Sequence, residues 1–73
     1  MKVFEFIRTI DKESFYKITI NADRPYIYKH NEEVINNIRK FKDNCPAAMN
    51  NIKKIELETC NYDGWVDIII YTK

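Results

Sequence analysis

Hydrophobic positions divide the first part of the chain into two short segments. From Lys2 to Ile10 the apolar residues are nearly continuous, which favours a strand covered on both faces. From Phe15 to Ala22 apolar and polar residues alternate, as in a strand with one face in water. Because the polar residues 11–14 separate these segments, the pattern predicts that the two pair as a hairpin.

The apolar spacing then changes to that of a helix. Asn31 can cap a helix whose first turn holds Glu32 and Glu33, where acidic side chains are favoured. Residues 24–30 fit either a strand or an earlier start of this helix, and we predict the earlier start because Ile27 extends the apolar face by a turn. Residues 44–46 should end the helix. Its apolar stripe consists of Val34, Ile35, Ile38 and Phe41.

The last two segments form a hairpin pattern around the only glycine. Asp63-Gly64 suits a tight two-residue turn, because glycine adopts positive φ freely and aspartate tolerates it. This loop sets Leu57 opposite Ile70 and gathers one inward face for the helix to cover. That face consists of Ile55, Leu57, Val66, Ile68 and Ile70.

Two longer loops give other registers of the same hairpin. A three-residue loop scatters the apolar residues over both faces, because a slip of one residue inverts every side chain. A four-residue loop keeps the faces but sets Glu58 opposite Asp67, and like charges directly opposed are destabilising. We therefore predict the two-residue loop.

The other face of this hairpin is the candidate binding surface. Aromatic and aliphatic side chains lie there among three carboxylates, and exposed patches of this kind mark protein contacts. The alternative is that Tyr62 and Trp65 form a cross-strand pair that only stabilises the hairpin. The predicted partner-binding residues are Tyr62, Trp65, Ile69, Tyr71, Glu56, Glu58 and Asp67.

Composition and charge exclude several function classes. Residues 1–73 have room for one domain, and the formal net charge of +1 gives no global field toward nucleic acid or an anionic membrane. A lone glycine cannot form a phosphate-binding loop. Because charged Glu5 and Arg8 lie in the first segment, we expect no signal peptide, and we also expect no membrane span. We therefore expect a cytoplasmic location. In that location Cys45 and Cys60 should be free thiols.

The sequence contains no convincing catalytic motif. A metal ion held by Glu56, Glu58 and Asp67 is conceivable, but position 60 is cysteine where a nuclease of the D…E-x-K kind needs lysine. The only histidine, His30, has neither a cysteine nor an orienting acidic residue at a spacing typical of a catalytic pair. We therefore expect no enzyme activity, no cofactor and no metal.

Nucleic-acid binding is the alternative from another class. A small RNA- or DNA-binding module would use the basic helix, with Tyr26 and Tyr28 as stacking platforms. Its candidate residues are Lys29, His30, Arg39, Lys40, Lys42, Lys53 and Lys54.

In size and composition the chain resembles phage- or mobile-element-encoded inhibitors of host machinery, including anti-CRISPR proteins. This resemblance implies a larger host protein or ribonucleoprotein as partner, whose surface the inhibitor occludes. A homodimer through the same hairpin face is a further alternative. The predicted fold is a single small α+β domain, ββαββ, with a four-stranded, mainly antiparallel sheet and one helix packed on one face, residues 2–10 and 65–71 being central.

Overall fold

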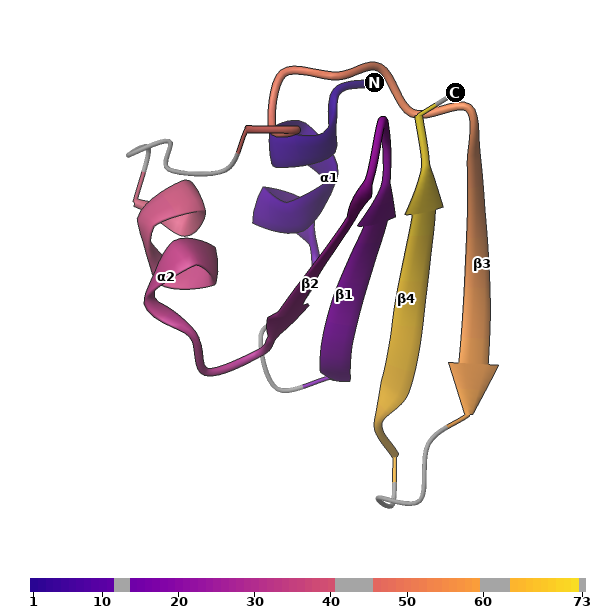
Figure 1. Cartoon of the computed structure of the whole chain (residues 1–73). Helices are drawn as coiled ribbons and strands as arrows, with labels where there is room; N and C mark the ends of the chain where they lie inside the picture. Colours follow the sequence, from indigo (N-terminus) through magenta and orange to yellow (C-terminus); the bar gives the residue numbers. More distant parts are fainter. Residues whose placement is uncertain (12–13, 41–45, 60–63, 73) are drawn as a thin grey trace.

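A computed structural model of the chain describes residues 1–11, 14–40, 46–59 and 64–72. These residues form a small α+β fold with two helices and a four-stranded mixed sheet (Figure 1). The elements in chain order are α1 (Val3–Thr9), β1 (Phe15–Asn21), β2 (Pro25–Lys29), α2 (Glu33–Arg39), β3 (Lys54–Thr59) and β4 (Val66–Tyr71). The α+β class and the four-stranded sheet are as predicted, whereas helix α1 was not predicted.

The predicted first strand is wrong, because its residues form helix α1. Val3 and Ile7, one helical turn apart, are both fully buried. The Glu5 side chain accepts a hydrogen bond from the Lys2 backbone nitrogen at 2.9 Å, which satisfies a free donor at the helix start. A short apolar run fits a buried strand and a helix equally well, so the pattern alone could not separate them.

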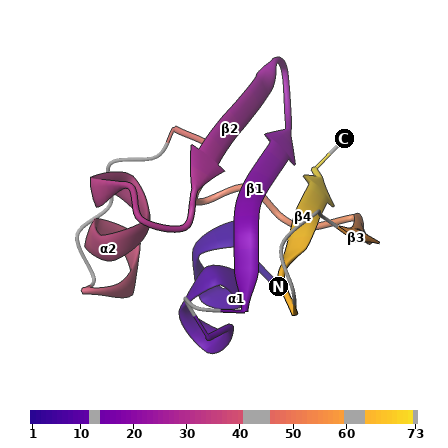
Figure 2. The ribbon, with the colours of Figure 1, turned by 90° about the horizontal axis from the view of Figure 1, so that it is seen from below.

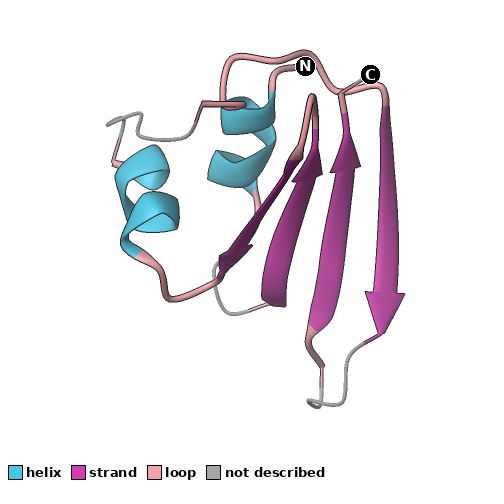
Figure 3. Ribbon diagram, in the orientation of Figure 1, coloured by secondary structure: helices cyan, strands magenta, loops and turns pink. Residues whose placement is uncertain are grey.

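The sheet has the order β2-β1-β4-β3 (Figure 3). Its central pair, β1 and β4, is parallel, and the two outer pairings are antiparallel. The central position of β4 agrees with the prediction. The predicted hairpin between residues 2–10 and 15–22 is wrong, because β1 pairs with β2 and β4 instead.

The predicted early helix start at residues 24–30 is also wrong. Pro25–Lys29 is strand β2, whose alternate side chains Tyr26 and Tyr28 pack against the core. Helix α2 begins at Glu33 with Glu32 as its N-cap, one residue beyond the predicted cap Asn31. Helix α2 ends at Arg39 with Lys40 as its C-cap, short of the predicted end at residues 44–46, while Phe41 falls outside the described residues.

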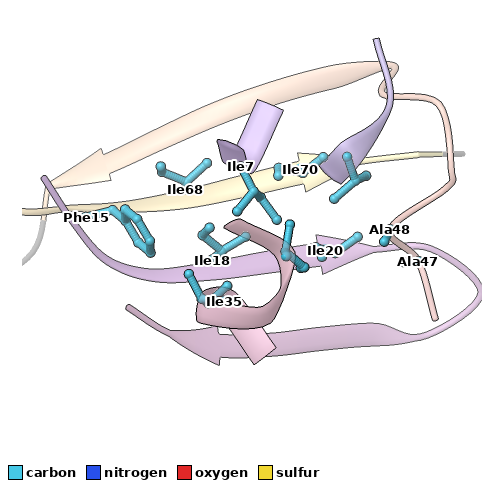
Figure 4. Packing of buried hydrophobic residues seen from close by; sticks show 11 residues of the cluster. Ile7, Phe15, Ile18, Ile20, Ile35, Ala47, Ala48, Ile68 and Ile70 are labelled. Carbon is cyan, nitrogen blue, oxygen red and sulfur yellow. The ribbon is translucent and has the colours of Figure 1, made fainter. Parts of the chain in front are cut away.

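The core lies between the sheet and the two helices. In Figure 4, the side chains of β1 and β4 point toward those of the helices, with Phe15 at one end and two alanines at the other. The fully or nearly fully buried residues are Val3, Ile7, Phe15, Ile18, Ile20, Ile35, Ile38, Ala47, Ala48, Ile68 and Ile70.

The C-terminus of each helix is capped by an arginine of the other helix. Arg8 of α1 donates its Nε–H to the Ile38 carbonyl oxygen at 2.7 Å, and Arg39 of α2 donates from Nη2 to the Ile10 carbonyl oxygen. Carbonyls at a helix C-terminus lack partners within the helix and carry a partial negative charge. The two arginines therefore cap and join the helix pair.

Candidate protein-binding surface

Both helices lie on one side of the sheet, so the opposite side is free of them (Figure 1). Figure 2 shows that β3 lies beyond both helices, at the edge of the sheet. Since successive residues of a strand point to opposite faces, the buried positions Ile18, Ile20, Ile68 and Ile70 identify the helix side. We call the other side the open face.

The open face consists of three cross-strand rows in the order β2, β1, β4, β3. The first row is Lys29, Lys17, Asp67, Glu58. The second is Ile27, Thr19, Ile69, Glu56, and the third is Pro25, Asn21, Tyr71, Lys54. In the first row the basic residues lie at the β2 end and the acidic residues at the β3 end.

The hairpin register is not the predicted one. Thr59 lies opposite Val66 and Leu57 opposite Ile68, which is the register of the four-residue loop. Glu58 therefore does face Asp67, the arrangement that led us to reject this loop. Gly64 has a φ of +74°, as a tight turn requires, while Asp63 lies outside the described residues.

Lys17 explains why the like charges are tolerated. Lys17 is on β1, the neighbour of β4, and its Nζ lies 3.9 Å from Asp67 Oδ2. The Asp67 side chain is 18% exposed and the Lys17 side chain 42%, so the pair is partly shielded from water at its Asp67 end. The sequence argument weighed β3 against β4 alone and omitted the third strand.

The register nevertheless keeps the predicted faces, because it differs from the predicted one by two residues. Glu56, Glu58, Asp67, Ile69 and Tyr71 all lie on the open face, on β3 and β4. We call these five residues the acidic half of the open face. Tyr62, which was predicted to belong with them, lies outside the described residues.

Glu56 and Tyr71 interact on this surface. The hydrogen bond from the Tyr71 side chain, followed by the nearby charge of Lys54, lowers the pKa of Glu56 below its ordinary value. The same hydrogen bond, with desolvation and the charge of Glu56, raises the pKa of Tyr71. Lys54 Nζ lies 3.5 Å from Glu56 Oε1 and 5.3 Å from the centre of the Tyr71 ring. These contacts hold the Tyr71 ring in place at the C-terminal end of β4.

Trp65 occupies a different setting from the predicted one. Its ring centre is 4.5 Å from that of His30 and 5.9 Å from that of Tyr16, in edge-to-face geometry. The His30 backbone nitrogen donates to the Tyr16 carbonyl oxygen at 3.0 Å, which fixes the loop after β2 against β1. Trp65 is therefore half-buried and part of an aromatic cluster. The sequence analysis did not predict that His30 is its packing partner.

Two apolar residues of β3 are exposed, contrary to the prediction that they belong to the core. Leu57 is 64% exposed and Ile55 is 37% exposed, although both lie on the helix side of the sheet. Parity assigned their face correctly. Their exposure follows from the edge position of β3, beyond the helices, for which the residue pattern holds no signal.

The described basic residues proposed for nucleic-acid binding do not form one surface. Arg39 is held by the C-terminus of α1, whereas Lys54 is paired with Glu56 at the far edge of the sheet. Tyr26 and Tyr28 are half-buried and pack against the core. Lys29 lies on β2, Lys40 at the end of α2 and Lys53 just before β3, while Lys42 is outside the described residues.

Within residues 1–11, 14–40, 46–59 and 64–72, no three potential ligands among His, Cys, Asp and Glu come together as a metal site. Cys45 and Cys60 lie outside these ranges. In the same ranges, neither helix is long and apolar enough to cross a membrane. Comparisons with protein-family models, with curated proteins and with solved structures gave no match to this chain.

Proposed function

We propose that the protein is a non-enzymatic binding protein that modulates or inhibits a larger protein or ribonucleoprotein by docking the open face of its sheet. The observation that carries this proposal is the acidic half: Ile69 and Tyr71 lie among carboxylates on a sheet face that neither described helix covers. An antiparallel or mixed sheet with one solvated face is normally polar there. Aliphatic and aromatic side chains on such a face favour a protein contact.

The contacts within the acidic half support a preformed surface. Tyr71 is held by Glu56 and Lys54, and Asp67 by Lys17, so these side chains lose little freedom when a partner binds. The carboxylates suit a partner that presents basic groups around an apolar centre. The size and composition of the chain, which resemble phage- or mobile-element-encoded inhibitors such as anti-CRISPR proteins, support host machinery as the class of partner.

The test compares one change on the open face with one on the helix side. Ile69→Lys puts a charge at the centre of the acidic half, while Thr9→Lys adds the same charge at an exposed position of α1. With both variants folded by circular dichroism, affinity capture from host lysate followed by titration of the purified partner should show binding by the wild type and by Thr9→Lys. Ile69→Lys should bind more than about tenfold more weakly. Equal binding by the two variants would refute the open face as the docking surface.

A further inference from the structure

Strand β3 has an unprotected edge. It is the last strand in the order β2-β1-β4-β3, and its six residues are all exposed. Its ladder in the described structure runs to β4 alone, so its outer backbone N–H and C=O groups are available to another strand. The opposite edge differs, because β2 begins with Pro25, which lacks an N–H donor, and contacts α2.

The residues of β3 are complementary to themselves when two copies run antiparallel. Lys54, Glu56 and Glu58 point to the open face, and Ile55 and Leu57 to the helix side. A two-fold axis perpendicular to the sheet at Glu56 sets Lys54 opposite the partner's Glu58 and Ile55 opposite the partner's Leu57. By symmetry each of these pairs occurs twice.

We propose that two copies of the chain associate through β3 in this register, which joins their two sheets into one continuous sheet. Both helix layers then lie on the same side of the joined sheet. Ile55 and Leu57 of each copy cover the corresponding pair of the other, which removes the most exposed apolar side chains of β3 from water.

The electrostatics of β3 favour this partner. Glu58 lies opposite Asp67, which forms an ion pair with Lys17, and no ion pair of Glu58 occurs among the described residues. The partner's Lys54 supplies the missing positive charge directly across the strand edge. The two Glu56 side chains meet at the axis, but each has a Lys54 within 3.5 Å and a hydrogen bond from Tyr71, which offset their repulsion.

The neighbouring registers are less favourable. An axis at Leu57 sets Glu56 opposite the partner's Glu58 twice and gathers four carboxylates. An axis at Ile55 sets Lys54 opposite the partner's Glu56 twice, but it also sets Lys53 opposite the partner's Leu57 twice and leaves Glu58 without a basic partner. Of these three registers, only the one at Glu56 sets both Ile55 and Leu57 opposite apolar residues and also gives Glu58 a basic partner.

Charge exchange tests both the dimer and its register. Sedimentation velocity over a range of concentrations should show a wild-type dimer. Glu58→Lys and Lys54→Glu each place like charges opposite one another twice and should weaken the dimer by more than about tenfold. An equimolar mixture of these two variants restores both opposite-charge pairs, so it should form a heterodimer, and the double variant should dimerise again.

Glu33→Lys is the matched control, since it reverses an exposed charge on α2, away from β3. It should dimerise like the wild type, and circular dichroism should show every variant folded. A wild type that stays monomeric at all concentrations would overturn the dimer. A Glu58→Lys dimer as tight as the wild type, or a mixture that stays monomeric, would overturn the register. These outcomes are independent of the proposed function, which is tested at Ile69 on the open face.

Discussion

Replacing Arg8 with methionine should destabilise the protein more than any other single change of a surface charge that we consider. The substitution keeps an unbranched side chain of good helix propensity but removes the guanidinium. In the native protein this group donates from Nε to the Ile38 carbonyl oxygen at 2.7 Å and lies 4.5 Å from the centre of the Phe4 ring. The change therefore leaves a C-terminal carbonyl of α2 without its charged donor.

The size of the effect follows from these contacts. A hydrogen bond to a charged group contributes about 1.5 to 3 kcal/mol, and a cation near a helix C-terminus about 0.3 to 1 kcal/mol, the two being partly the same interaction. We expect a loss of about 2 kcal/mol in the free energy of unfolding. For a domain of this size that corresponds to a fall of roughly 8 to 16 °C in the melting temperature.

Arg24→Met is the matched control. The Arg24 guanidinium lies 4.6 Å from the centre of the Tyr26 ring at an exposed position, so its loss should cost about 0.5 kcal/mol. Arg39→Met should fall between the two, because it removes a hydrogen bond to Ile10 but also removes a buried Nε that has no partner among the described residues. Urea unfolding followed by circular dichroism measures all three. Equal losses for Arg8→Met and Arg24→Met would refute reciprocal capping of the helices.

Three further outcomes follow from the structure. Ile70→Ala should cost about 2 to 5 kcal/mol in urea unfolding because Ile70 is fully buried, whereas Leu57→Ala should cost little in the monomer, and equal costs would contradict the edge position of Leu57. Because the pKa of Glu56 is lowered in the folded state, chiefly by Tyr71, its contribution to stability is present above the unfolded pKa and is lost as the pH falls through the folded pKa. Tyr71→Phe should therefore raise the pKa of Glu56 in a carboxyl NMR titration, and an unchanged value would exclude this hydrogen bond. His30→Ala should shift Trp65 fluorescence to longer wavelength, because their ring centres are 4.5 Å apart, and an unchanged spectrum would argue against the aromatic cluster.

The alternating segment of β1 was predictable from the sequence, whereas strand β2 and the N-terminal helix were predicted as other structures. Strand β1 agrees with its prediction, since each apolar residue of an alternating strand has one possible face. The run Val3 to Ile10 has apolar residues at both strand and helix spacing, and tertiary packing decides between them. In the structure that packing comes from α2 and from residues 47–52, whose backbone carbonyls of Ala48 and Asn50 accept hydrogen bonds from α1 at 3.0 Å. No local pattern contains those contacts.

The candidate site was predicted in its face but not in its register. The residues of the acidic half lie on the predicted side of the sheet, because the true register differs from the predicted one by an even number of residues. The register itself could not be derived from two strands. Lys17 comes from a strand distant in sequence, and it is the residue that makes the juxtaposition of Glu58 and Asp67 acceptable.

The position of the helices explains why β3 has exposed apolar residues on one side of the sheet and carboxylates on the other. Helix α2 contacts α1 and β2, so the helix layer is displaced toward the β2 edge of the sheet (Figure 2). Ile55 and Leu57 have the parity of core residues but no helix above them, while Glu56 and Glu58 on the same strand belong to the open face. A strand with apolar side chains on one face, carboxylates on the other and a free backbone edge is suited to contact with another chain. Because the open face and the edge of β3 are at right angles to each other, a pair of chains joined at β3 would still present both acidic halves, side by side, to a larger partner.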